Sequence, residues 1–376
     1  MPDSPKNRQI RIIDQTIREG MQYQGLVFSL DQRMQILAFQ EKLGVDVCQA
    51  GYPSAHPKEA AMVQHMADHA KDKRYLIRVA ALGRAFMPDA NILLNTRIHD
   101  VHLHLHVKNT DPQAEIKKIL TGLGVVIDHI RSTRPDAAIS VAMLDMGRTG
   151  PDLLDRCIKF LCRDLQIDIL SLPDTSGIMA PNQVADQIRH AKYLAGDTAV
   201  SIHCHNDLGM ASANSVMGIA AGADVLETSV LGIGERNGIG DLYTVVRLLA
   251  DQGITSGFRH EDMELVHAYY TFVDNIVKDQ TGQGLISPCT PAFGRAVHTH
   301  VAGTHANGQF GTAAAPDFYL NLLCGRQMVQ QYLDLHHIVF STARLDEITR
   351  AIKDASIQKG RRLKKKEIQD IAASMG

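Results

Sequence analysis

Hydrophobic and polar positions alternate regularly along the first 260 residues of the chain. Short apolar runs, typical of buried strands, are separated by longer stretches in which apolar residues recur at helical spacing. Eight runs are strand candidates: residues 10–14, 45–50, 76–82, 99–107, 139–144, 168–172, 198–203 and 224–231. Helical patterns fill most gaps, including 31–43, which ends at Gly44, and 151–163. Eight strands with helical connections in about 250 residues predict an α/β fold, the (β/α)8 TIM barrel. A doubly wound sheet is the alternative, but no GxGxxG motif follows the first strand.

The pattern changes after residue 260. Helices are expected at 260–279 and 343–356, and a stretch rich in Gly, His and Ala (281–316) separates them. We therefore expect two domains, a catalytic barrel over 1–260 and a smaller, mainly helical subdomain over 261–376.

Polar side chains gather where the expected strands end, which is where TIM barrels carry their active sites. The clearest case is His203-Cys204-His205-Asn206-Asp207 after the seventh strand. His203 and His205 share one strand face because alternate residues point the same way. Two imidazoles so placed, with a carboxylate from another strand end, can bind one divalent ion. A structural, hydrogen-bonded histidine pair is the weaker interpretation in this barrel context.

Other charged and polar positions have simpler alternatives. His102, His104 and His106 alternate with Leu and Val, so all three should face the barrel interior, where substrate binding or packing is favoured over a second metal site. Arg18 and Glu19 follow the first strand and could form a purely structural ion pair.

Composition narrows the functional classes. The chain has 39 basic and 41 acidic residues, 45% hydrophobic residues and a net charge of -2, so no excess charge directs it to nucleic acid or a membrane surface. The basic run over 359–366 is typical of a solvated helix face. Six scattered cysteines without CxxC spacing and a polar N-terminus predict a cytoplasmic protein, and no apolar stretch is long enough to span a membrane.

Four motifs carry a family resemblance: DQTIREG, LPDTSG, IHCHNDLG and GIGERNG. They resemble the signatures of the DRE-TIM metallolyase superfamily, in particular its Claisen-condensing branch, the 2-isopropylmalate, homocitrate and citramalate synthases. GVDVCQAGYPSAHP (44–57) and GRAVHTHVAGTHANG (294–308) are similar to further family motifs, so the resemblance covers nearly the whole chain.

The resemblance implies a condensation of acetyl-CoA with a 2-oxo acid on a divalent metal. Glu19, His203 and His205 would be the metal ligands, a set that suits Mg²⁺, Mn²⁺ or Zn²⁺. Arg18 would stabilise the developing enolate oxygen with its fixed positive charge. The metal would polarise the keto group of the acceptor.

The same resemblance implies residues that bind the small-molecule substrates. Thr175, whose alternative role is a helix cap, would bind the carboxylate of the 2-oxo acid, with Gln22, His102 and Arg148 close by. His305, in the subdomain, would take part in proton transfer. In the family the subdomain reaches over the barrel of a second subunit, which implies a homodimer.

Several positions depart from the family pattern. Gln49 and Leu144 stand where the family has glutamates, and Ile239 replaces an asparagine of isopropylmalate synthases, which leaves a fourth protein ligand open. These changes raise the hypothesis of an acceptor with a second anionic group, met by histidines or by Arg84.

Three alternatives stay open. A lyase or aldolase of the same superfamily would run the reverse chemistry, but its lyase branch carries a cysteine in the loop after the last strand, and GIGERNGIGDL has none. An Fe(II) oxygenase also uses two histidines and a carboxylate, although the barrel context argues against it. A non-catalytic binding or structural role is the third.

Overall fold

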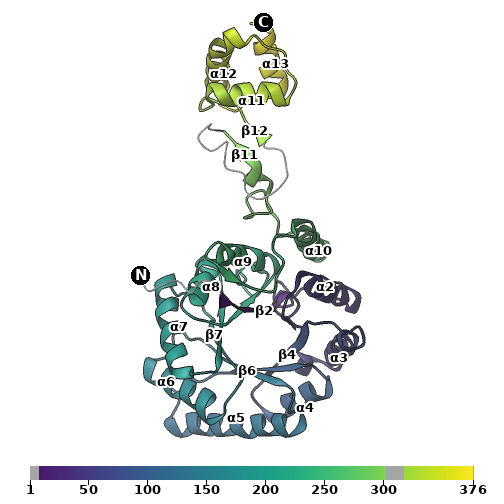
Figure 1. Ribbon diagram of the computed structural model, residues 1–376, viewed down its shortest axis with the longest axis vertical. Coiled ribbons are helices and arrows are strands. Elements are labelled where there is room, and N and C mark those ends of the chain that lie inside the picture. Colours follow the sequence, from purple (N-terminus) through teal and green to yellow (C-terminus); the bar gives the residue numbers. More distant parts are fainter. Residues whose placement is uncertain (1–7, 302–316, 376) are drawn as a thin grey trace. The chain divides into compact units, whose positions relative to one another are not determined.

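Eight parallel strands close into a barrel in the computed structural model, which describes residues 8–301 and 317–375 (Figure 1). Each expected run overlaps one barrel strand, so the predicted TIM barrel is confirmed. The strands are β2 (Arg11–Asp14), β3 (Val47–Gln49), β4 (Arg78–Arg84), β5 (Asp100–Leu105), β6 (Ala138–Met143), β7 (Ile169–Asp174), β8 (Ala199–Cys204) and β9 (Val225–Thr228). A separate parallel pair joins β1 (Arg8–Gln9) to β10 (Ile254–Thr255).

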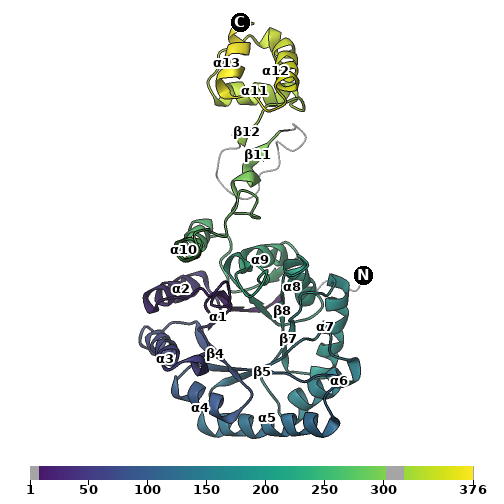
Figure 2. The same cartoon turned by 180° about the vertical axis from the view of Figure 1, so that it is seen from behind.

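Helices surround the barrel on its outside, as seen from both sides in Figures 1 and 2. After the short α1 (Thr16–Gly20) they are α2 (Leu30–Leu43), α3 (Pro57–Asp72), α4 (Met87–Asn95), α5 (Gln113–Thr133), α6 (Pro151–Lys159), α7 (Pro181–Ala195), α8 (Ala211–Ala220) and α9 (Leu242–Ala250). A π turn over Phe160–Asp164 continues α6, which accounts for the longer helix predicted there. Single turns of 3-10 helix lie at Pro53–Ala55 and Val230–Gly232.

Local sequence sets the limits of α2. The Ser29 hydroxyl accepts from the Gln32 backbone N–H, and the Gln32 side chain accepts from the Ser29 N–H, a capping box that begins the helix. Gly44 ends it in the left-handed conformation, with φ of 76°. A Cβ at this position would lie 2.2 Å from the carbonyl oxygen of Gly257, so only glycine fits.

An apolar layer fills one level of the barrel interior. Ile13, Val47, Ala80, Ile169 and Val225 pack together there. Side chains two residues further along a strand point to the same face, nearer its C-terminal end. Directly after β2, and on β3, β7 and β9, those positions are the polar residues Gln15, Gln49, Ser171 and Glu227. The strand pattern therefore places a polar layer directly beyond the apolar one.

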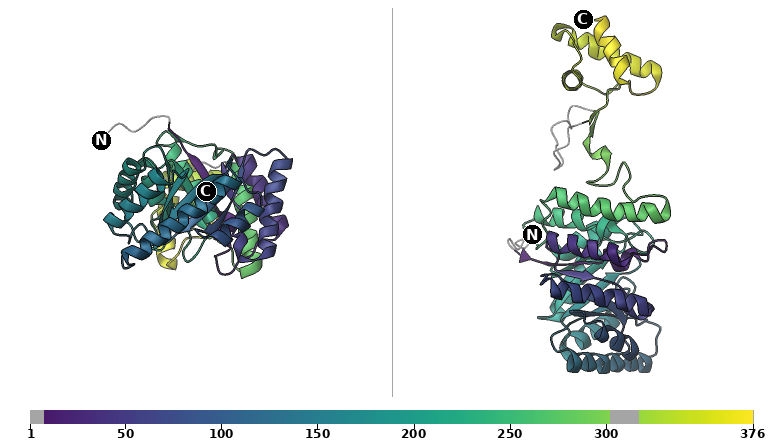
Figure 3. Two further views of the ribbon diagram at one scale, coloured as in Figure 1. Left: turned by 90° about the horizontal axis from the view of Figure 1, so that it is seen from below. Right: turned by 90° about the vertical axis from the view of Figure 1, so that its right-hand side faces the viewer.

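The chain divides into two units between Leu285 and Ile286, not at residue 260. The reason is α10 (Met263–Thr281), which packs against α2, as the right-hand view of Figure 3 shows. The Tyr269 hydroxyl donates to Asp14 Oδ2 at 2.8 Å, and the Tyr270 hydroxyl donates to Asp241 Oδ1 at 2.9 Å. These two hydrogen bonds join α10 to the barrel.

The C-terminal unit has its own small core. Leu333, Ile348, Ile352 and Ile368 are buried in it together with further apolar residues. Its elements are η4 (Arg295–His298), β11 (Thr299–His300), β12 (Asp317–Phe318), α11 (Arg326–Leu335), η6 (Thr342–Arg344), α12 (Leu345–Lys359) and α13 (Lys365–Ser374). Strand β11 pairs with β12 in parallel, and α12 lies where the sequence predicts a helix. Across the described parts of both units, every helix is too short or too polar to cross a bilayer.

Candidate metal centre and active site

Glu19 is held at the C-terminal end of the barrel by the short helix α1, which follows β2 almost directly. Asp14, the last residue of β2, anchors the start of that helix. Its Oδ1 accepts hydrogen bonds from the Thr16 backbone N–H at 2.8 Å and from the Thr16 hydroxyl at 2.5 Å. In this position at the end of the barrel, the Glu19 side chain is only 2% exposed.

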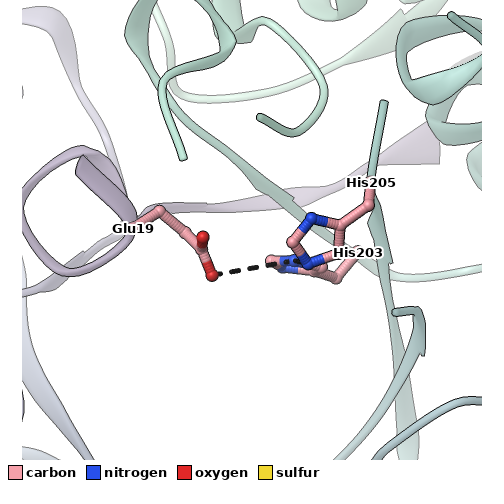
Figure 4. Close-up of side chains that lie close together, drawn as sticks. All are labelled: Glu19, His203 and His205. Carbon is pink, nitrogen blue, oxygen red and sulfur yellow. Dashed lines mark hydrogen bonds and ion pairs between the residues drawn. The ribbon is translucent and has the colours of Figure 1, made fainter. Parts of the chain in front are cut away.

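His203 and His205 lie at the end of β8, and Figure 4 shows Glu19 reaching toward them from α1. Both histidines are buried. Their Nε2 atoms are 3.3 Å apart, and His203 Nε2 is 3.9 Å from Glu19 Oε1. One potential ligand atom from each of the three side chains lies within 4.8 Å of the others. The structure thus brings together the three residues that the sequence singled out as metal ligands.

The chemistry of these three side chains fits a cation. Glu19 Oε2 and His205 Nδ1 are buried and have no hydrogen-bond partner among the described residues. Burial and the neighbouring His203 lower the pKa of His205 to about 3, so its imidazole is neutral at pH 7 and keeps a lone pair for a metal. In the described chain no fourth His, Cys, Asp or Glu joins the group.

Glu227 is a site residue that the sequence analysis did not single out. Its Oε2 lies 3.3 Å from His203 Nδ1 and accepts from Gln15 Nε2 at 2.7 Å, while its Oε1 accepts from the Ser201 hydroxyl at 2.7 Å. Burial alone would raise the pKa of Glu227, but the neighbouring His203 and the bond from Ser201 contribute to a net lowering of the pKa to about 2. Glu227 therefore stays charged beside a histidine of the candidate metal centre. The signal in the sequence was an acid two residues after Val225, at an inward position of β9.

Arg18 connects the candidate metal centre to the rest of the cavity. Its guanidinium donates to Glu19, to Gln15 Oε1 at 2.9 Å, to Gln22 Oε1 at 3.1 Å and to Gln49 Oε1 at 2.6 Å. Burial alone would raise the pKa of Glu19, but the charge of Arg18 contributes to a net lowering. The side chain of Arg18 is 14% exposed, so its charge lies in a largely dry environment.

A cavity of about 580 Å³ opens over this group. It is lined by Glu19, His203 and His205 and by four of the other residues predicted for the site: Arg18, Gln22, His102 and Thr175. The Thr175 hydroxyl accepts from the backbone N–H of Asp145 at 2.9 Å, which leaves its own proton available to a ligand.

Two predicted positions, Arg148 and His106, lie outside the cavity. Arg148 does not line the cavity: its Nε donates to Asp145 Oδ2 at 2.7 Å within a turn, and its side chain is 64% exposed. His106 follows the end of β5 and is exposed, so only His102 and His104 of the three histidines line the cavity. His305 lies outside the described residues.

The suggested role of Arg84 is not supported by its position. Its guanidinium is paired with Asp89, at 2.8 Å between Arg84 Nη2 and Asp89 Oδ1, and it does not line the cavity. Leu144, which replaces a family glutamate, does line the cavity. Of the groups that the hypothesis of a second anionic group named, the histidines His102 and His104 line the cavity and Arg84 does not.

Comparison with known proteins gives three kinds of match. A family model described as HMGL-like matches residues 9–269. A probable 2-isopropylmalate synthase of Methanosarcina acetivorans is 27% identical over 391 residues, covering 98% of this chain and 72% of the relative. A homocitrate synthase of Pyrococcus abyssi is 27% identical over 339 residues, covering 86% of this chain and 89% of the relative.

Among solved structures, a Bacillus subtilis HMG-CoA lyase superposes with a TM-score of 0.61 at 19% identity, over 75% of this chain and 97% of that one. A Brucella melitensis HMG-CoA lyase superposes with a TM-score of 0.59 at 18% identity, over 72% of this chain and 99% of that one. At such identities the likeness establishes the shared barrel fold alone.

Proposed function

The chain belongs to the HMGL-like family, and we propose that it is a metal-dependent acyltransferase that condenses acetyl-CoA with a 2-oxo acid. Its curated relatives include 2-isopropylmalate and homocitrate synthases, in agreement with the resemblance to the Claisen-condensing DRE-TIM enzymes that the motifs carry. These synthases are acyltransferases, the enzyme class expected from the sequence.

The observation that carries the proposal is the buried group of Glu19, His203 and His205 beneath a cavity that Arg18 also lines. A carboxylate and two imidazoles suit Mg²⁺, Mn²⁺ or Zn²⁺. When bound, such an ion polarises the keto group of a 2-oxo acid and makes its carbon electrophilic.

The side chains around this centre have separate tasks. Thr175 offers a hydroxyl proton to the carboxylate of the acceptor. Arg18, fixed by bonds to Gln15 and Gln49, supplies positive charge where oxyanion character develops, and a largely buried position strengthens that effect. Glu227 holds His203 so that Nε2 faces Glu19 and His205.

Condensation is favoured over cleavage by the absence of a thiol. No cysteine lines the cavity in the described chain. Cys204, the nearest in sequence to the histidine pair, is fully buried, and burial raises the pKa of its thiol. The lyase branch carries a cysteine in the loop after the last strand, and the corresponding loop here, GIGERNGIGDL, has none.

Mass analysis of the products tests the proposal. Purified protein is incubated with a divalent metal, acetyl-CoA and, in turn, each of a panel of 2-oxo acids. We expect a 2-hydroxy acid that has two more carbons and one more carboxylate than one of the acceptors, together with free coenzyme A. Cleavage of a 3-hydroxyacyl-CoA without any condensation would establish the lyase instead. Neither reaction, in a protein that binds no metal, would favour a non-catalytic role.

The C-terminal unit has a proposed part in this function. We infer that the protein is a homodimer and that residues of the subdomain, including His305, complete the active site. The support is the similarity of residues 294–308 to the corresponding family motif.

A further inference from the structure

The orientation of the Gln49 side-chain amide follows from its neighbours. Gln49 Oε1 lies 2.6 Å from Arg18 Nε, and Gln49 Nε2 lies 2.7 Å from His102 Nδ1. A guanidinium can only donate hydrogen bonds. The amide oxygen must therefore face Arg18, and the NH2 group must face His102.

This orientation determines which nitrogen of His102 carries the proton. An amide NH2 group only donates, so His102 Nδ1 has to accept and cannot be protonated. A neutral imidazole without a proton on Nδ1 carries it on Nε2. A doubly protonated ring would set two donors against each other at 2.7 Å. Burial, which lowers the pKa of His102, acts in the same direction.

The Nε2–H of His102 has no hydrogen-bond acceptor among the described residues. His102 Nε2 is buried and makes no hydrogen bond within the described residues, and the residue is 4% exposed. His102 lines the same cavity as Arg18 and Thr175. A buried donor without a partner costs about 1–3 kcal/mol, a cost that the oxygen of a bound ligand would remove.

We propose that Gln49 is a positioning residue that holds His102 as the neutral Nε2–H tautomer, and that His102 donates this hydrogen to an oxygen of the bound 2-oxo acid. The identity of the ligand rests on the proposed function, whereas the tautomer depends only on the bonds among Arg18, Gln49 and His102. A glutamate at position 49, as in the family pattern, would instead accept a hydrogen from Nδ1. The change from glutamate to Gln49 thus reverses the hydrogen-bonding direction of His102.

Nuclear magnetic resonance of ring-¹⁵N-labelled histidine in the full-length, Mg²⁺-loaded protein tests the tautomer. His102→Asn identifies the signals of His102 by their loss. We expect an unprotonated Nδ1 and a protonated Nε2 in the wild type, and a proton on Nδ1 in Gln49→Glu. Gln22→Glu is the matched control, because Gln22 also accepts from Arg18 but has no bond to His102; its His102 signals should keep the wild-type pattern. A protonated Nδ1 in the wild type, or an unchanged ring in Gln49→Glu, would overturn the assignment.

Addition of pyruvate, 2-oxoisovalerate or 2-oxoglutarate tests the contact with substrate. The acceptor that supports coenzyme A release should shift the His102 Nε2 signal. Gln49→Glu should raise the KM for this acceptor about tenfold, with a smaller change in kcat. Turnover of an acceptor that leaves this signal in place would refute the contact. If no acceptor supports release, the proposed function and the contact both fail, while the ligand-free spectra still decide the tautomer.

Discussion

His203 Nδ1 lies 3.3 Å from Glu227 Oε2, and this contact leaves His203 Nε2 facing Glu19 and His205. The strand register explains it, because His203 of β8 and Glu227 of β9 are directly paired. Side chains at paired positions of neighbouring strands point to the same face of the sheet. The carboxylate can therefore orient a histidine of the candidate metal centre without belonging to it.

Glu227→Gln should weaken metal binding about 10- to 100-fold, since partners that orient a ligating histidine contribute on that scale. Equilibrium titration of the metal-free protein with Zn²⁺ measures the effect. Glu235→Gln is the control, because Glu235 also lines the cavity but pairs with Arg236 rather than with a histidine. An equal loss of affinity in both variants would mean that overall charge, not the contact with His203, matters.

The metal-free protein should lose stability as the pH falls from about 6.5 toward 3. The unfolded chain protonates His205 near the ordinary pKa of about 6.5, whereas in the folded protein burial lowers that pKa to about 3. The unfolded state therefore binds more protons in this window, and the group alone contributes a slope of up to about 1.4 kcal/mol per pH unit.

Urea denaturation at a series of pH values checks this dependence. His205→Asn should flatten the slope, and the exposed His65→Asn should leave it as in the wild type. A His205→Asn protein with the full slope would show that other groups cause it.

Arg18→Lys should lower kcat about 10²- to 10³-fold, the loss typical of removing one oxyanion-stabilising donor. An ammonium group cannot reproduce the forked bonds of the guanidinium to Gln15 and Gln49. Coenzyme A release under saturating substrates gives kcat directly. Arg97→Lys, at a 66% exposed arginine of a surface ion pair, serves as the matched variant. Full activity of Arg18→Lys would show that the Arg18 guanidinium is not needed for catalysis.

Arg33→Met should destabilise the barrel by about 3–5 kcal/mol, because it leaves the buried Glu59 carboxylate without its partner. The two side chains form paired bonds, at 3.0 Å from Arg33 Nη1 to Glu59 Oε1 and at 2.6 Å from Nη2 to Oε2. Chemical denaturation of Arg33→Met and of the double variant Arg33→Met/Glu59→Leu measures the cost. The double variant should be the more stable of the two, and the opposite order would contradict this account.

The sequence predicted the barrel because alternating strand and helix patterns leave few other solutions. It also predicted a metal centre on His203 and His205, since strand ends converge in that fold. The family resemblance, not the strand pattern, named Glu19 as the carboxylate. Glu227 was missed because its role depends on the register between β8 and β9, which a single strand pattern does not contain.

Two other differences follow from particular side-chain pairings. Arg148 was expected near the acceptor, but a turn at Asp145, which has φ of 66°, pairs the arginine with that carboxylate instead. The barrel unit continues beyond residue 260 because the hydroxyls of Tyr269 and Tyr270 donate hydrogen bonds to barrel carboxylates. Such pairings between distant segments cannot be read from hydrophobic periodicity.

Restoration of activity by metal tests the central claim most directly. The wild-type protein and His203→Ala are stripped with a chelator, and acceptor-dependent release of coenzyme A is then followed as a divalent metal is returned. We predict that the wild type recovers release only when metal is added, and that His203→Ala does not recover at metal concentrations that saturate the wild type. Release by the stripped wild-type protein, or full recovery of His203→Ala at the same metal concentration, would contradict a metal centre built on Glu19, His203 and His205.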